Sequence, residues 1–241
     1  MKAVILAAGV GSRLGDLTKD KPKCMLPVFN DTLLIDYQIE VLKEFGISER
    51  NIFIIGGHKV DVLQNHLKDK SVSVIFNSKF REWNNIYSFY MIKAIEKISD
   101  KDDFILLNSD TFFHKDIFKY LLDCKHPNSV VIDSFKKLGN EEMKVLTVGK
   151  RIIKFGKDIS PNIAEGEYIG LAKFKKEDLE PLFDTMEFLI KGGKTDIWYE
   201  IAFNNVLDKI DIGYTDTKGK PWIEIDDTKD YQKARELNIV L

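Results

Sequence analysis

The stretch MKAVILAAGVGSRLGDLTKDKPKCMLPV, residues 1–28, decides both the fold and the candidate site of this chain. Its apolar run, residues 3–8, ends in a loop that contains Gly9 and Gly11. This pattern is typical of a buried parallel strand that leads into a tight turn. Glycines in such a turn let backbone N–H groups approach a ligand closely, and groups of this kind bind phosphate.

Two basic residues follow the glycines, Arg13 and, ten residues later, Lys23. The loop lacks the dinucleotide fingerprint, because Leu14 stands where a small residue is needed, and it lacks the Gly-Lys-Ser/Thr of the Walker pattern. An ordinary strand-to-helix turn therefore stays open for the glycines alone. The two fixed positive charges favour phosphate binding, so we predict a triphosphate-binding loop at the C-terminal end of the first strand.

The composition fits one α/β domain over residues 1–241. The chain is 44% hydrophobic and carries a net charge of −2, with 36 basic and 38 acidic residues. It has no overall basic excess, so we expect neither a nucleic-acid partner nor attraction to a membrane surface. No stretch is long enough to span a bilayer, so we expect no stable membrane insertion. Its two cysteines favour a reducing compartment, and we expect a cytoplasmic protein.

Strand and helix patterns alternate along the first half of the chain. This alternation predicts an α/β fold with a mixed, mainly parallel sheet flanked by helices. The expected strands are residues 3–8, 51–57, 72–76, 104–107 and 129–133, and the expected helices are residues 33–45, 60–67, 86–95 and 116–122.

The rhythm changes after Asp133, where shorter strands separated by glycines suggest an antiparallel lid or acceptor region. We find no linker, so residues 1–133 are expected to form the nucleotide-binding part of a single domain and residues 134–241 its acceptor part. The expected strands here are residues 143–148, 151–155, 168–174, 212–214 and 222–225, with helices at 177–184, 196–207 and 228–237.

Acidic residues at two distant positions are candidate metal ligands. Asp110 directly follows a predicted buried strand, where open α/β sheets bind ligands. Glu224 and Asp226 alternate on one face of an extended segment. Three carboxylates that converge beside a phosphate site would suit Mg²⁺. Helix capping is the alternative for Asp110, and Asp227 is the expected cap of the last helix.

Amide and hydroxyl side chains open the helix predicted after residue 85. Asn84, Asn85 and Ser88 lie at its first turn. One of them is expected to cap the helix. Base recognition is the alternative, because an amide offers both a donor and an acceptor to the edge of a nucleobase.

Two motifs of the N-terminal stretch, LAAGVGSRL (residues 6–14) and KPKCMLPV (residues 21–28), resemble the signature of the sugar-nucleotidyltransferase superfamily. The resemblance covers nearly the whole chain and implies the Rossmann-like fold of nucleotide-diphospho-sugar transferases. Four later stretches resemble its choline-phosphate cytidylyltransferase-like branch, which includes enzymes for 2-aminoethylphosphonate and related small acceptors: WNNIYSFY (83–90), EEMKV (141–145), GEYIGLAKF (166–174) and WIEIDD (222–227).

The resemblance assigns roles to particular residues. Arg13 and Lys23 would act on the phosphates, and Asn85 with Ser88 would read the base, which the branch implies is cytosine. Mg²⁺ would be held by Asp110, Glu224 and Asp226. The nucleotide would contact Leu6, Ala7, Ala8, Gly9, Gly11, Ser12, Arg13, Lys23, Asn85, Ser88, Ser109 and Asp110. Residues 15–17 depart from the family pattern, since many relatives have a proline there.

The function implied is transfer of CMP from CTP to phosphocholine. A quaternary ammonium is recognised by aromatic faces and nearby carboxylates. The acceptor-binding candidates are Asp133, Lys144, Glu167, Tyr168, Trp198 and Tyr199, with Glu165, Glu200 and Trp222 as further options. Lys144 would meet the acceptor phosphate or the transferred phosphate.

Other acceptors and functions stay open. The same chemistry on 2-aminoethylphosphonate or inositol 1-phosphate is one alternative, and a sugar 1-phosphate with another nucleoside triphosphate is a second. A nucleotide-sensing subunit without catalysis is the alternative from another class. The sequence leaves a homodimer open.

Overall fold

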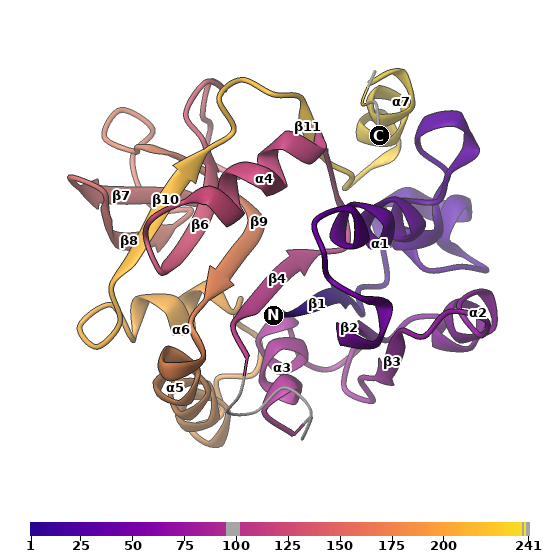
Figure 1. Ribbon diagram of the computed structural model, residues 1–241, viewed down its shortest axis with the longest axis horizontal. Coiled ribbons are helices and arrows are strands. Elements are labelled where there is room, and N and C mark those ends of the chain that lie inside the picture. Colours follow the sequence, from indigo (N-terminus) through magenta and orange to yellow (C-terminus); the bar gives the residue numbers. More distant parts are fainter. Residues whose placement is uncertain (95–101, 238, 240–241) are drawn as a thin grey trace.

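A nine-stranded sheet runs through both halves of the chain, in the strand order β3-β2-β1-β4-β9-β6-β10-β8-β7 (Figure 1). The structure is a computed structural model that describes residues 1–94, 102–237 and 239. Ile95, the last residue of the helix predicted over residues 86–95, lies outside the described residues. The sequence prediction of a mixed, mainly parallel α/β sheet flanked by helices is confirmed.

The first half of the chain supplies a parallel set of strands. β1 (Lys2–Ala7) pairs on one side with β2 (Ile52–Gly56) and on the other with β4 (Phe104–Asn108), and β3 (Ser73–Phe76) lies beyond β2. Because parallel strands end at the same edge of a sheet, the loop after β1 and the turn after β4 lie next to each other.

The second half extends this sheet. β9 (Gly166–Phe174) lies between β4 and β6 (Asn128–Asp133) and is antiparallel to both. β10 (Ile212–Asp216) follows β6, and the hairpin of β7 (Lys144–Val148) and β8 (Arg151–Gly156) closes the row. The expectation that the strand over 168–174 belongs to an added region is wrong, because β9 is a central strand of the main sheet.

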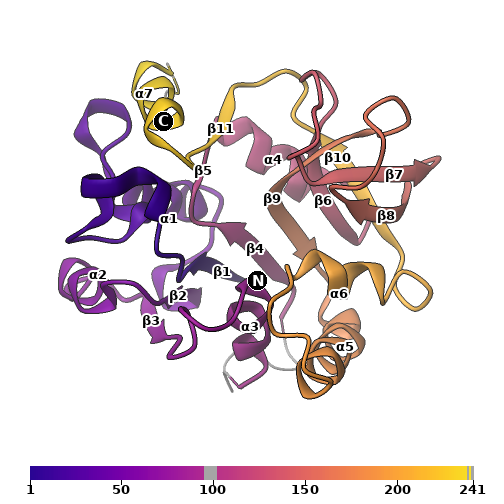
Figure 2. The ribbon, with the colours of Figure 1, turned by 180° about the vertical axis from the view of Figure 1, so that it is seen from behind.

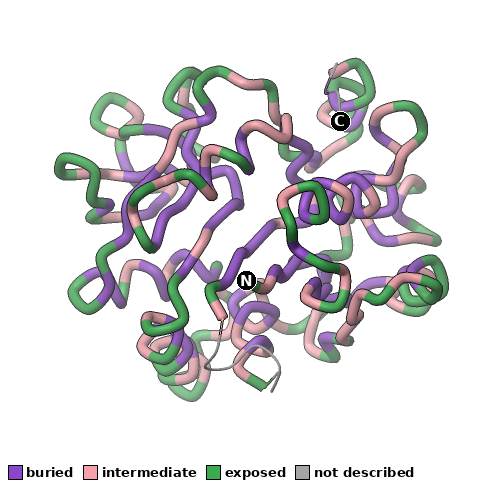
Figure 3. Tube along the Cα trace, in the orientation of Figure 1, coloured by how far each residue is buried: buried purple, intermediate pink, exposed green. Residues whose placement is uncertain are grey.

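Helices cover both faces of the sheet (Figure 2). Side chains of β1 alternate between the two faces, so Ile5 packs in one core and Val4 in the other. The central strands β1, β2, β4, β6 and β9 are almost entirely buried between these layers (Figure 3). One layer contains α1 (Leu34–Glu44), α2 (Val60–His66), α4 (Lys115–Asp123) and α7 (Thr228–Glu236), and the other contains α3 (Asn85–Tyr90), α5 (Leu179–Lys191) and α6 (Glu200–Asn204).

A second ladder, of two strands, joins the turn after β4 to the acidic segment near the end of the chain. β5 (Thr111–Phe113) pairs antiparallel with β11 (Trp222–Glu224), and Glu224 lies opposite Thr111. The Ile225 N–H also donates to the Asp110 carbonyl over 3.0 Å. This ladder carries the late acidic segment to the turn after β4.

Several element ends differ from the sequence prediction. β5 was not predicted, because three residues are too few to show a periodicity. The helix expected over residues 177–184 continues to Lys191, whereas the one expected over 196–207 is only Glu200–Asn204. Leu33 precedes α1 without a side-chain cap. Of the three candidates for the cap of α3, Asn84 is the one that caps it, and Asp227 caps α7 as predicted.

Of the helices that the structure describes, none has the length and apolar character needed to cross a bilayer.

Candidate active site

A cleft of about 1020 Å³ lies at the edge where β1 and β4 end. It collects side chains from residues 6 to 233, so it depends on the whole fold. All but three of the predicted site residues line it: Leu6, Ala7, Ala8, Gly9, Gly11, Arg13, Lys23, Asn85, Ser88, Ser109, Asp110, Asp133, Glu167, Tyr168, Trp198, Glu224 and Asp226.

The glycine loop is held in place by its own short 3₁₀ segment, residues Ser12–Thr18. Gly11 has a φ of 67°, a conformation that favours glycine. The Thr18 hydroxyl donates to the Gly11 carbonyl over 2.9 Å, and His58 Nε2 donates to the Thr18 carbonyl over 2.7 Å. A side chain at Gly57 would place its Cβ 2.5 Å from the Ala8 carbonyl oxygen. The loop is therefore fastened to the end of β2.

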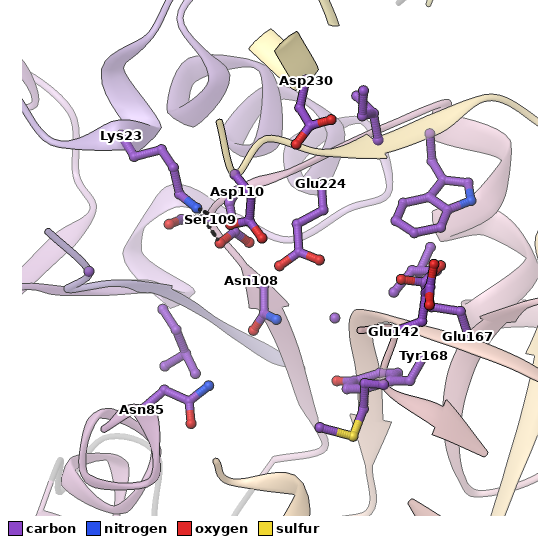
Figure 4. A pocket seen from close by; sticks show the side chains of 18 of the residues that line it. Lys23, Asn85, Asn108, Ser109, Asp110, Glu142, Glu167, Tyr168, Glu224 and Asp230 are labelled. Carbon is purple, nitrogen blue, oxygen red and sulfur yellow. Dashed lines mark hydrogen bonds and ion pairs between the residues drawn. The ribbon is translucent and has the colours of Figure 1, made fainter. Parts of the chain in front are cut away.

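Three carboxylates and two cations meet at the centre of the cleft. Figure 4 shows Lys23, Asp110 and Glu224 of this cluster. Lys23 Nζ donates to Asp110 over 2.8 Å and to Asp226 over 3.2 Å. Arg13 lies 2.9 Å from the second oxygen of Asp226. Oxygens of Asp110, Glu224 and Asp226 all lie within 4.8 Å of one another. The fold thus brings together groups that are about two hundred residues apart in the chain.

This crowding shifts the protonation of the cluster. The protein around Glu224 desolvates its carboxyl even though the side chain opens into the cleft, and the charges of Asp110 and Asp226 act in the same direction. Both effects raise the pKa of Glu224 well above its usual range. Burial alone would lower the pKa of Lys23, but the Asp110 and Asp226 charges outweigh it and the net shift is upward. The cluster therefore favours additional positive charge.

A divalent cation fits this cluster. Asp110 Oδ1 is buried and has no hydrogen-bond partner among the described residues. Carboxylate oxygens are the donors that Mg²⁺ prefers, and it is usually bound through one or two carboxylates together with substrate phosphates. Asp110, Glu224 and Asp226 are thus the residues that would hold it, next to the loop that would hold the phosphates.

The end of the cleft where we predict that the base binds lies at the start of α3. Asn85 Oδ1 accepts from the Tyr199 N–H over 2.9 Å, which leaves the Asn85 amide N–H groups for a ligand. Ser88 Oγ accepts from Asn77 Nδ2 over 2.9 Å and is itself buried. Since its hydroxyl hydrogen is not used in that bond, Ser88 can still donate.

The opposite end of the cleft is rich in acids and aromatic rings (Figure 4). Asp133 accepts from the Trp222 indole N–H over 2.7 Å, which fixes the ring. Glu167 is buried and accepts from Lys136 over 2.8 Å. Burial raises the pKa of Glu167, and the Lys136 charge opposes that rise. This end can therefore hold a charged head group.

Two buried tyrosines, Tyr168 and Tyr199, pack at this end of the cleft. The Tyr199 hydroxyl donates to Asn108 over 3.0 Å and lies 3.0 Å from the Tyr168 hydroxyl. Gly170, with a φ of 82°, packs directly against Asn108, where a Cβ would lie 2.6 Å from Nδ2. Next to this pair, burial raises the pKa of Glu200 to about 7.

Three of the predicted site residues lie outside the cleft lining. Lys144 is fully buried, and its ammonium donates to the carbonyls of Gly139, Asn140 and Glu142 over 3.0–3.4 Å. It therefore holds the loop before β7, and the expectation that it meets a phosphate is wrong for this arrangement. Tyr199 is buried behind Tyr168, and Ser12 starts the 3₁₀ segment. Glu165, a further option, also lies outside the lining and accepts from Tyr214.

Sequence reasoning missed several residues that line the cleft. Lys136, Glu142 and Lys157 lie in loops or at strand ends, where no periodicity marks them. Asn77, which directly follows β3, lines the cleft, is buried and donates to Ser88, but no role was predicted for it. Lys136 and Lys157 lie in no motif, and Glu142 lies in the quoted EEMKV stretch but was given no role, because its place depends on how β7 pairs with β8 and β9.

The chain belongs to the nucleotidyl transferase family, whose sequence model matches residues 2–141. It is a nucleotidyltransferase, in agreement with a glycine loop, two cations and three carboxylates in one cleft.

Within this family the chain is similar to bacterial cytidylyltransferases. It is 36% identical to the CTP:phosphoglutamine cytidylyltransferase of Campylobacter jejuni over 202 residues, which is 78% of this chain and 79% of that protein. It is 29% identical to the choline-phosphate cytidylyltransferase of Streptococcus pneumoniae over 98% of both chains. The solved structure of the CTP:phosphocholine cytidylyltransferase from S. pneumoniae superimposes with a TM-score of 0.79 at 26% identity, over 98% of this chain and 97% of that one.

Proposed function

We propose that this protein transfers CMP from CTP to a small phosphorylated acceptor and releases pyrophosphate, with Mg²⁺ as the cofactor. The observation that carries the proposal is the convergence of Arg13 and Lys23 with the carboxylates of Asp110, Glu224 and Asp226 at the end of the glycine loop. Cytidine is proposed because the similar proteins of C. jejuni and S. pneumoniae use CTP.

The chemistry needs charge compensation more than it needs a general base. A phosphate oxygen is already nucleophilic at neutral pH, so no activated serine or cysteine is required. Cys24 is unsuited to that role, since burial raises the pKa of its thiol to about 12. The barrier comes from bringing two anions together. Positioning and electrostatic stabilisation are therefore the expected sources of rate.

Each part of the cleft has a task in this scheme. The backbone of the glycine loop binds the triphosphate, and Lys23 faces the α-phosphorus, where negative charge builds up during attack. When bound, Mg²⁺ neutralises phosphate charge and orients the triphosphate. Asn85 and Ser88 keep free hydrogen-bonding groups for the base. The acceptor phosphate would enter from the side of Glu167 and Tyr168, in line with the leaving pyrophosphate.

Phosphocholine, the acceptor predicted from the sequence, stays a prediction. The similar choline-phosphate enzyme of S. pneumoniae and the acidic, aromatic end of the cleft support it. The similar phosphoglutamine enzyme of C. jejuni supports a phosphorylated amino-acid derivative instead. The shared class is a small phosphorylated amine or amide.

Pyrophosphate release from all four nucleoside triphosphates tests the proposal. Each triphosphate is mixed with Mg²⁺, the protein and one acceptor from a panel of phosphocholine, 2-aminoethylphosphonate, inositol 1-phosphate, glucose 1-phosphate and O-phosphoserine. We expect release with CTP and at least one amine-bearing acceptor. Release with another triphosphate in preference to CTP would overturn the nucleotide assignment. Binding of CTP without release for any acceptor would support a nucleotide-sensing subunit.

A further inference from the structure

At the acceptor end of the cleft, the indole rings of Trp222 and Trp198 each have a lysine ammonium of the same chain over one face. Lys136 Nζ lies 5.5 Å from the centroid of the Trp222 ring, and Lys157 Nζ lies 4.7 Å from the centroid of the Trp198 ring. A quaternary ammonium is recognised by vacant aromatic faces. These two faces instead hold the protein's own ammonium groups, which would repel a second cation.

The ammonium groups of the two lysines differ in their hydrogen bonds and ion pairs to other residues of the chain. Lys136 is bound to the buried Glu167 over 2.8 Å and lies 3.8 Å from Glu142. The ammonium of Lys157 makes no hydrogen bond to any other described residue, and its ion pair is with the almost fully exposed Glu141 at 3.9 Å. Exposed pairs of this kind contribute little. Lys157 lines the cleft, so its donors are available to a ligand.

A carboxylate oxygen without a hydrogen-bond partner lies in the same cleft as Lys157. Glu200 lines the cleft, is only 5% exposed, and its Oε2 has no hydrogen-bond partner among the described residues. Lys157 lies over the ring of Trp198, which precedes Glu200 by two residues, so Lys157 and Glu200 belong to the same part of the cleft lining. A buried polar atom of this kind normally has a partner.

We propose that Lys157 and Glu200 together recognise a zwitterionic head group, with Lys157 binding a carboxylate and Glu200 binding an ammonium. This inference rests on the proposed function and narrows it. The acceptor is then a phosphorylated α-amino acid or a close analogue, and not a compound whose only charged group besides the phosphate is a quaternary ammonium. A carboxylate on the acceptor removes the repulsion that Lys157 exerts on a lone cation.

Matched ligand pairs test this recognition directly. O-Phospho-L-serine and phosphoethanolamine differ only by the carboxylate, and 2-amino-5-phosphonopentanoate with 4-aminobutylphosphonate forms a longer pair. Dissociation constants are measured by calorimetry with Mg²⁺ and α,β-methylene-CTP, which cannot react at the α-phosphorus. We expect the carboxylate to tighten binding by about tenfold or more in at least one pair, as for a charge-assisted hydrogen bond.

Variants then assign the preference to the residue. In Lys157→Met the ratio within the pair should fall to about one, while CTP affinity stays unchanged. Lys154→Met is the matched control, because its ammonium pairs with Asp158 at 2.5 Å and lies outside the cleft lining. Equal binding within both pairs, tighter binding of phosphocholine than of every carboxylate-bearing ligand, or a preference that survives in Lys157→Met would overturn the inference. Because binding is measured without turnover, failure of the proposed reaction would be seen separately in the pyrophosphate assay.

Discussion

Replacement of Lys23 by methionine is expected to lower turnover about a hundredfold. Its ammonium makes two charge-assisted hydrogen bonds, of 2.8 Å to Asp110 and 3.2 Å to Asp226, and its side chain is only 12% exposed. In such an environment, loss of one contact to developing phosphate charge costs about 3 kcal/mol of transition-state stabilisation, which corresponds to a hundredfold in rate.

The assay is steady-state pyrophosphate release with CTP, Mg²⁺ and the best acceptor, at saturation. Circular dichroism checks that the variant is folded. Lys21→Met serves as the matched control, because Lys21 belongs to the same loop but does not line the cleft. Turnover of Lys23→Met within a few-fold of the wild type would refute the role that we assign to this side chain.

A second readout of the same variant concerns Mg²⁺ itself. Without nucleotide, the Lys23 ammonium lies on two of the three carboxylates that would hold the ion. Its removal leaves these carboxylates without their main counter-charge, so we expect Mg²⁺ to raise the melting temperature of Lys23→Met more than that of the wild type. An equal Mg²⁺ effect on both proteins would contradict a shared carboxylate site.

Three further outcomes follow from burial and close packing. Burial raises the pKa of Glu200 from near 4.5 to about 7, so the folded state favours the neutral acid. As the pH rises from 4 to 8, the unfolding free energy of the wild type should therefore fall by roughly 3 kcal/mol relative to that of Glu200→Gln. Urea denaturation of both proteins measures this difference. Native protein should react with iodoacetamide at the half-buried Cys124 well before the buried Cys24, as read by mass spectrometry. In Gly57→Ala the new Cβ would lie 2.5 Å from the Ala8 carbonyl oxygen. This clash should destabilise the fold by roughly 1–3 kcal/mol and raise the KM for CTP. An unchanged melting temperature would contradict this packing.

The convergence of the residues that we assign to the nucleotide could be predicted from sequence, because their signals are local. A buried strand that ends in glycines, followed by Arg13 and Lys23, occupies one short stretch. The rule that parallel strands carry ligands at their C-terminal edge then places Asp110 beside this loop. The structure brings these groups together at hydrogen-bond distance.

The part of the cleft that we assign to the acceptor was predicted less completely. Four of its six candidates line the cleft, but other lining residues are placed by long-range pairing and were missed. Long-range pairing also places the predicted metal ligand Glu224, which reaches Asp110 through the ladder of β5 and β11, and β5 is too short to leave a pattern. The family resemblance implied a phosphate contact for Lys144, whereas its ammonium binds the carbonyls of the loop before β7. Lys157 has no motif at all and enters the cleft just after β8.

Transfer of the labelled α-phosphate is the most direct test of CMP transfer. The protein is incubated with Mg²⁺, an acceptor that supports pyrophosphate release, and CTP labelled with ³²P at either the α- or the γ-position, and the products are separated by chromatography. We expect the α-label to appear in a new compound that contains the acceptor and the γ-label to appear only in pyrophosphate. Appearance of the γ-label in the acceptor, or of the α-label only in free CMP, would contradict transfer of CMP to a phosphorylated acceptor.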